Sequence, residues 1–106
     1  IVFTPTTTDI HQDHGVVTSE AKRAFRNCTL LGYELPWNNI IFHENCFISL
    51  NGAHVEKKLK ALKCYDTQKT RLYFDREYLH GLLRAKGLHI GEKYAESFEV
   101  IKLVLS

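Results

Sequence analysis

Short runs of apolar residues alternate along the chain with longer stretches in which apolar residues recur every three or four positions. The short runs predict β-strands over residues 1–4, 30–34 and 98–105, with one or two further strands within 40–48. The longer stretches predict amphipathic helices over residues 9–27, 54–65 and 75–86. Because strands alternate with helices, the pattern predicts an α/β fold with a layered sheet, and residues 1–106 fit one domain.

Polar residues and glycines predict where these helices begin and end. Asp9 is the expected N-cap of the first helix, with Gln12 as its capping-box partner, and Asp75 is the expected N-cap of the third. Asn51-Gly52 predicts a turn, and Gly87 is the expected C-terminal cap of the third helix. These residues therefore mark the predicted boundaries between helices and loops.

The charge of the chain argues against partners that need a strongly basic surface. Its 14 Lys and Arg are dispersed among 12 Asp and Glu, which leaves a net charge of +2. Nucleic acids and anionic membranes attract clustered cations, so neither is an expected partner. No apolar run approaches the ~18 residues that a membrane-spanning helix needs, and we expect neither a membrane span nor a signal peptide.

The cysteines and the first residues of the chain add two expectations. Cys28, Cys46 and Cys64 form no CxxC pair, which favours reduced thiols in the cytoplasm over a disulfide framework or a zinc knuckle. The chain holds no methionine and opens directly on the apolar residues Ile1-Val2-Phe3. We therefore expect it to be a piece of a longer protein.

The residues with the clearest chemistry are Asp9-Ile10-His11-Gln12-Asp13-His14, which follow the first predicted strand. Ligands of open α/β sheets bind outside the carboxyl ends of the strands, so a site is expected here. His11 and His14 are three residues apart, which places both imidazoles on one side of a helical turn. Zinc accepts imidazole nitrogen, and Asp13 has the chemistry to orient an imidazole. The same spacing is also typical of surface histidines, and one turn cannot supply the three ligands of a catalytic zinc.

Several segments, in order along the chain, share features with one enzyme family. They are Phe3-Thr4-Pro5 with residues 9–14, Leu31-Gly32-Tyr33-Glu34-Leu35-Pro36, residues 57–68 (with Thr67 where Ser is usual), Arg84-Ala85-Lys86-Gly87 and Tyr94-Ala95-Glu96-Ser97-Phe98. Together they resemble the C-terminal part of the PIG-L/LmbE-like zinc-dependent N-acetylglucosaminyl deacetylases, and the resemblance covers nearly the whole chain. It implies a Rossmann-like layered sheet that forms the C-terminal half of a larger fold.

The resemblance also implies what this chain lacks. Members of that family carry a His-Pro-Asp-Asp motif after their first strand, which supplies a His and an Asp to zinc and a second Asp as general base. This sequence has no His-Pro-Asp-Asp. We therefore expect a partial zinc site. An exposed strand edge favours association, so we also expect a homo-oligomer or association with a missing N-terminal half.

The resemblance implies a role for each site residue. His14 matches the family's zinc ligand, and His11 matches the residue that stabilises the oxyanion and protonates the leaving amine. Asp13 matches the carboxylate that pairs with that second imidazole. Glu96 and Arg84 are candidates for substrate binding, although an ion pair for Glu96 and a solvated side chain for Arg84 stay open. The implied reaction is zinc-dependent hydrolysis of the acetamide of an N-acetylglucosamine-type sugar or glycoconjugate.

Two other functions stay open on the sequence alone. Because the upstream ligands are missing, the chain also fits a non-enzymatic fragment or interaction module that keeps the fold without a catalytic zinc. A metal-dependent phosphoesterase could use the same cluster, but it needs more Asp and His motifs than the chain contains. A His-Pro-Asp-Asp motif upstream in the parent protein would favour the deacetylase.

Overall fold

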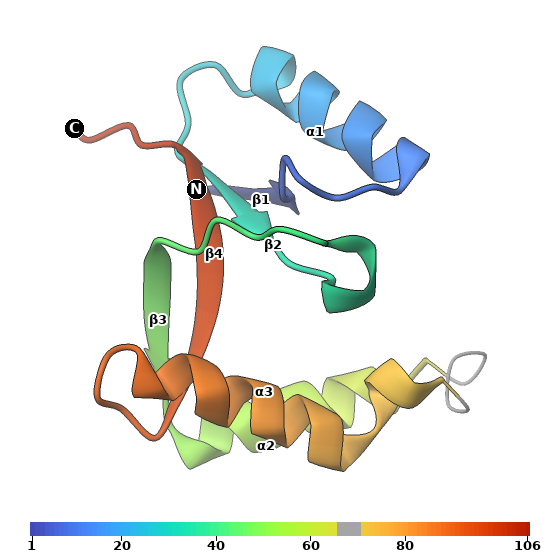
Figure 1. Ribbon diagram of the computed structural model, residues 1–106. Coiled ribbons are helices and arrows are strands. Elements are labelled where there is room, and N and C mark those ends of the chain that lie inside the picture. The colour runs from blue at the N-terminus through green and yellow to red at the C-terminus, as the bar shows by residue number, and fades with distance from the viewer. Residues whose placement is uncertain (66–70) are drawn as a thin grey trace. The chain divides into compact units, whose positions relative to one another are not determined.

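The computed structural model describes residues 1–65 and 71–106 (Figure 1). Within these residues its helices are α1 (Gln12–Ala24), α2 (Gly52–Leu62) and α3 (Arg76–Leu88), and its strands are β1 (Val2–Pro5), β2 (Leu30–Tyr33), β3 (Cys46–Leu50) and β4 (Tyr94–Lys102). Hydrogen bonds join the strands in the order β1-β2-β4-β3. Since β1 runs parallel to β2 and β2 runs antiparallel to β4, the sheet is mixed. The predicted α/β class is confirmed at this level.

The chain divides into two compact units, Ile1–Cys46 with Ser97–Ser106 and Phe47–Glu96. In the first unit α1 lies against β1 (Figure 1). Thr18 is buried on α1, and its hydroxyl donates to the carbonyl of Pro5 at 2.7 Å. A threonine hydroxyl therefore satisfies the last carbonyl of β1 where the helix covers it.

The second unit is built around the helices α2 and α3. Its buried core consists of Val55, Leu59, Leu83 and Tyr94, with Leu50 and Leu79 packed against them. In α2 the side chain of Asn51 accepts from the backbone N–H of His54 at 2.9 Å, and the His54 ring accepts from the backbone N–H of Asn51 at 3.2 Å. This reciprocal capping box fixes the first turn of α2.

Three predicted helix boundaries were wrong. The N-cap of α1 is His11 rather than Asp9, because the His11 ring accepts from the backbone N–H of Asp13. Asn51-Gly52 is the beginning of α2 rather than a separate turn. Gly87 lies inside α3, where a Cβ atom would be 2.5 Å from the carbonyl oxygen of Glu92. Its small size is therefore needed for close approach of another backbone segment rather than for a cap. Asp75 caps α3 as predicted.

The number of strands was predicted correctly, but the residues at which two of them begin and end were not. The structure assigns no strand to residues 40–42, and β3 lies at Cys46–Leu50. The last strand begins at Tyr94 and ends at Lys102, so it starts and stops earlier than the apolar run predicted.

All three cysteines are free thiols, with Cys28 and Cys46 partly buried. Within residues 1–65 and 71–106, no helix combines the length and apolar character needed to cross a membrane.

Candidate functional site

The candidate site lies on the loop that joins β1 to α1. Because β1 and β2 are parallel, their carboxyl ends lie at the same edge of the sheet, where ligands of open α/β sheets bind. The backbone N–H of Thr6 donates to the carbonyl of Tyr33 at 3.0 Å, which ties the start of the loop to the end of β2. A Cβ atom on Gly32 would lie 2.8 Å from Thr6 Cα. Glycine in β2 therefore lets the loop backbone lie directly against the sheet.

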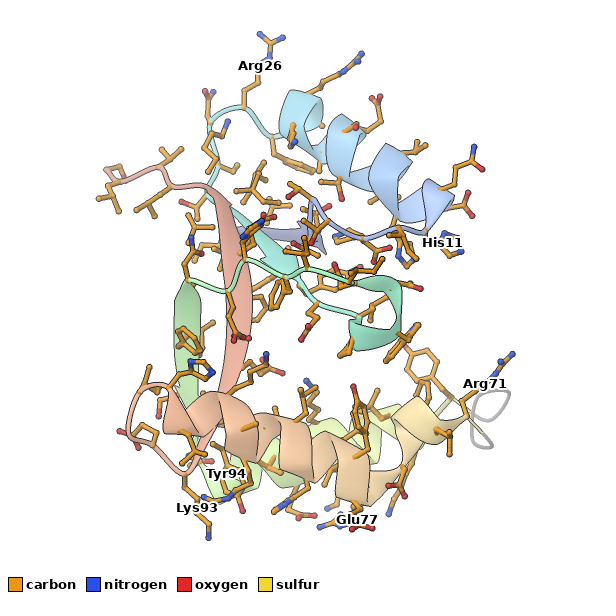
Figure 2. The ribbon with its side chains drawn as sticks, viewed as in Figure 1. His11, Arg26, Arg71, Glu77, Lys93 and Tyr94 are labelled. Atoms are coloured by element: carbon orange, nitrogen blue, oxygen red, sulfur yellow. The ribbon has the colours of Figure 1, made fainter. Side chains whose placement is uncertain are left out.

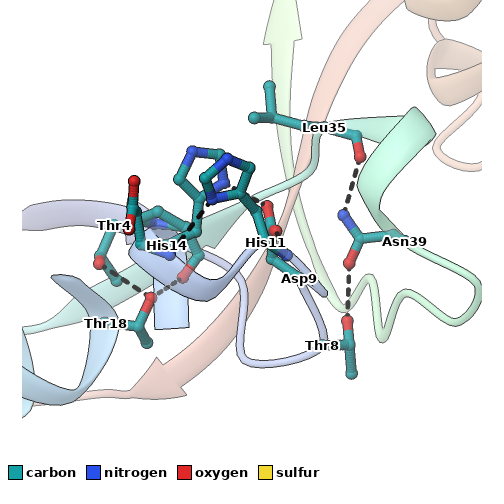
Figure 3. A network of polar contacts seen from close by, with 10 residues as sticks. Thr4, Thr8, Asp9, His11, His14, Thr18, Leu35 and Asn39 are labelled. Atoms are coloured by element: carbon teal, nitrogen blue, oxygen red, sulfur yellow. Dashed lines mark hydrogen bonds and ion pairs between the residues drawn. The ribbon is translucent and has the colours of Figure 1, made fainter. Parts of the chain in front are cut away.

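A buried carboxylate organises the histidines of this loop (Figure 3). Asp9 Oδ2 lies 2.9 Å from Nδ1 of His14, and Asp9 Oδ1 accepts the backbone N–H of His11 at 2.8 Å. The Asp9 side chain is 1% exposed, whereas that of His14 is 27% exposed. Both oxygens of the buried carboxylate are thus engaged, which is the condition under which such a group is tolerated.

The second imidazole lies beside the first. The rings of His11 and His14 stack with centroids 4.4 Å apart and an interplanar angle of 24°. Nδ1 of His11 accepts the backbone N–H of Asp13 at 3.2 Å, so in the neutral ring Nε2 carries the proton. His11 is exposed at the beginning of α1 (Figure 2). The pair therefore includes an accessible imidazole with an Nε2–H donor.

The loop is also fixed from the segment that follows β2. Thr8 Oγ1 donates to Oδ1 of Asn39 at 2.9 Å, and Nδ2 of Asn39 donates to the carbonyl of Leu35 at 2.9 Å (Figure 3). The backbone N–H of Ile10 donates to the carbonyl of Asn38, also at 2.9 Å. These contacts hold the loop on both sides of Asp9.

Glu99 of β4 holds the loop from the sheet itself. One oxygen of its buried carboxylate accepts from the Thr6 hydroxyl and the Thr7 N–H, both at 3.0 Å, and the other accepts from the Thr7 hydroxyl at 2.7 Å. Burial acts to raise the pKa of the Glu99 carboxyl, but these hydrogen bonds and the charge of His43 outweigh it, so the pKa lies below its usual value. Burial raises the pKa of the Tyr33 phenol, and the charge of Asp9 adds to the rise.

The lowered pKa of Glu99 predicts a loss of stability in acid. The contribution of the ionised Glu99 to the free energy of unfolding is fully present above its unfolded-state pKa of 4.5. It is lost as the pH falls through the lower folded-state pKa. Glu99→Gln should remove roughly 1 kcal/mol at neutral pH, because a hydrogen-bonded charge is lost, and should flatten the acid limb. Urea unfolding at a series of pH values measures both effects. Glu20→Gln, at an exposed position of α1, is the control, and an unchanged acid slope in Glu99→Gln would contradict the assignment.

The other predicted site residues have the following surroundings. Asp13 is exposed, and its observed contact with His11 is made by its backbone N–H, so the carboxylate–imidazole pairing stays a prediction. In the second unit Glu96 forms an ion pair with Lys58, the alternative that the sequence left open. The exposed Arg84 donates to the carbonyl of Lys93 at 3.0 Å and lies over the ring of Tyr94. Residues 66–68 of the family-like helix end lie outside the described residues.

Glu99 and Asn39 were not predicted from the sequence to be part of the loop structure. The only available signal for Glu99 was a carboxylate at an inward position of an apolar strand. Asn39 follows a short 3-10 helix, Pro36–Asn38, and nothing in its neighbours indicated a long-range partner. Both residues act on the site through Thr6, Thr7 and Thr8.

The donors gathered here do not form a complete metal centre by themselves. In the part of the chain that the structure describes, no group of three His, Cys, Asp or Glu is arranged to hold a metal ion. A catalytic zinc takes three protein ligands, of which an imidazole nitrogen is one common type. The chain matches no protein-family model, and no curated protein is significantly similar to it.

Proposed function

We propose that the chain supplies part of the site of a zinc-dependent deacetylase that hydrolyses the acetamide of an N-acetylglucosamine-type sugar. In this proposal it is the C-terminal half of a PIG-L/LmbE-like, Rossmann-like fold. The observation that supports it is the contact of Asp9, His11 and His14 at the carboxyl end of β1. That is the edge at which such sheets bind ligands.

The chain's own side chains have separate tasks in this proposal. His14 supplies one imidazole ligand, and the remaining ligands come from outside the described residues. Zinc, when bound, polarises the amide carbonyl and lowers the pKa of water. His11 would donate a hydrogen bond from Nε2 to the oxygen on which negative charge develops. Transfer of a proton to the leaving amine would require its imidazolium form, which becomes a neutral ring when the amine takes the proton. Its exposure allows a substrate to reach it.

The test is acetate release from an N-acetylglucosamine-type sugar by the chain alone and by the chain complemented with a polypeptide that carries His-Pro-Asp-Asp. We expect no release by the isolated chain, which has only one of the three expected ligands. The complemented protein should release acetate and lose this activity on chelation. A complemented protein that binds zinc stoichiometrically but releases no acetate would overturn the proposal.

A non-enzymatic interaction module is the second candidate. It is favoured by β1, which is an outer strand of the sheet order, and by large apolar residues that are exposed in this strand and directly before it. Ile1 is 81% exposed and Phe3 is 53% exposed. An open strand edge with apolar side chains favours association with another chain. If this candidate is correct, complementation yields a stable complex without deacetylation, so the acetate assay separates the two functions.

A further inference from the structure

Asp9 makes contacts that a helix cap or a solvated loop carboxylate does not make. Its side chain is 1% exposed, and its two oxygens accept from different parts of the site. Oδ1 is bound by the backbone N–H of His11 and Oδ2 lies against Nδ1 of His14, at 2.8 Å and 2.9 Å. Burial of a carboxylate is costly unless it is hydrogen-bonded, so these two contacts fix its position.

The chemistry of the carboxylate determines which nitrogen of His14 carries the proton. An ionised carboxylate accepts hydrogen bonds and donates none, so the ring nitrogen that faces Oδ2 must be the donor. A neutral imidazole has one N–H group. With the proton on Nδ1, the lone pair is on Nε2, and this is the atom left to bind a metal.

We infer that Asp9 is a positioning residue, whose carboxylate holds the His14 ring in the Nδ1–H tautomer and leaves the Nε2 lone pair as a metal ligand. The use of Nε2 as a ligand rests on the proposed function. A ligand histidine whose other nitrogen donates to a carboxylate is held in orientation and becomes a better donor to the metal. This role is separate from the one expected for Asp13, which was predicted to pair with the imidazole of His11 and whose side chain is exposed.

The neighbouring ring has the opposite arrangement. Nδ1 of His11 faces a backbone N–H donor, so that ring keeps its lone pair on Nδ1 and its proton on Nε2. Asp9 also binds the backbone N–H of His11, which fixes the main chain that carries this ring. The two stacked rings therefore present different outer atoms, a lone pair on His14 and an N–H group on His11.

The tautomer is measurable on the metal-free chain by long-range ¹H–¹⁵N correlation spectra of ¹⁵N-labelled histidine, at a pH where the rings are neutral. We expect His14 to be protonated at Nδ1 and His11 at Nε2. In Asp9→Asn one oxygen becomes an amide NH₂. If the remaining oxygen stays on the N–H of His11, the NH₂ donates to Nδ1 of His14 and shifts the proton to Nε2. The control Asp13→Asn should leave the His14 spectrum unchanged.

Three results decide the inference. A wild-type His14 protonated at Nε2 would overturn it without any substitution, which covers the case in which Asp9→Asn fails to fold. In Asp9→Asn the amide can rotate and present its oxygen to Nδ1, so the decisive variant is Asp9→Ala, which has no acceptor there. A His14 that stays protonated at Nδ1 in folded Asp9→Ala would also overturn the inference. A shift of the tautomer in Asp9→Ala but not in Asp13→Asn supports it.

Metal affinity gives a second measurement on the complemented protein. Zinc should bind about 10–100-fold more weakly in Asp9→Asn than in wild type or Asp13→Asn. Equal zinc affinity in the three proteins would overturn the positioning role. Failure of the proposed function is distinguishable from these results, because it would be seen as absent acetate release with an Asp9-dependent His14 tautomer.

Discussion

Replacing His14 with alanine in the complemented protein should abolish both zinc binding and acetate release, whereas replacing His11 with alanine should leave zinc bound. A ligand and a hydrogen-bond donor fail in different ways. Loss of one of three ligands removes the metal, but loss of one donor to the developing oxyanion lowers turnover by about 10²–10³-fold. The stacked rings have distinct hydrogen-bond partners, Asp9 for His14 and the Asp13 backbone for His11, which is why we expect them to differ.

Metal content and turnover, measured on the same preparations, check this expectation. His54→Gln is the matched control because His54 is exposed in the second unit, and glutamine at the third helical position also completes a capping box. It should change neither zinc content nor turnover. Equal loss of zinc in His11→Ala and His14→Ala would mean that both rings bind the metal.

Two glycines of α3 should respond to alanine in opposite directions. At Gly87 the added Cβ would lie 2.5 Å from the Glu92 carbonyl oxygen and 2.8 Å from the backbone of Lys93, so the backbone must shift. Overpacking of this kind costs about 1–3 kcal/mol, which exceeds the gain of about 0.5–1 kcal/mol that alanine has over glycine in a helix. Among the described residues, apart from its chain neighbours and its own helix backbone, no atom lies within 4 Å of the Cβ position of Gly81, so Gly81→Ala should only gain stability.

The free energy of unfolding of the two variants and wild type, from urea titration, tests this contrast. Gly81→Ala also serves as the control for the change in helix propensity, since both sites lie within α3. Stabilisation by Gly87→Ala would show that the segment after α3 adjusts without cost, and would contradict the close approach described above.

Amphipathic spacing was sufficient to predict the three helices, although α1 buries Thr18 and Ala21 and leaves the apolar Val16 and Val17 exposed. Helix α2, for example, buries Val55 and Leu59, four residues apart, as the periodicity predicted.

The capping residues were harder to predict. An aspartate such as Asp9 can either cap a helix or bind an imidazole, and the local sequence does not show which. Asp9 lies two residues before the true N-cap, in a loop held by contacts with Asn38 and Asn39, which are distant in the sequence.

The same limit explains what was missed at Gly87 and in β4. A glycine near the end of a helix has the same local signature whether it caps the helix or admits a second backbone, and only the path of residues 92–93 distinguishes the two. The run of apolar residues after Phe98 predicted a strand that extends further than the observed β4, because apolar character alone does not show where the partner strand ends. Leu103 and Leu105, beyond that end, are mostly exposed. The strand ends at Lys102, which is paired with Leu30 of β2.

The bonds from Thr6 and Thr7 to Glu99 join residues 93 and 92 positions apart in the sequence. Contacts at such separation form late in folding, since the closure of a long loop costs entropy before the contact contributes any stability. During synthesis the residues around Asp9 leave the ribosome well before Glu99. The loop that carries Asp9 therefore gains its bonds to Glu99 only after β4 has been made and has paired.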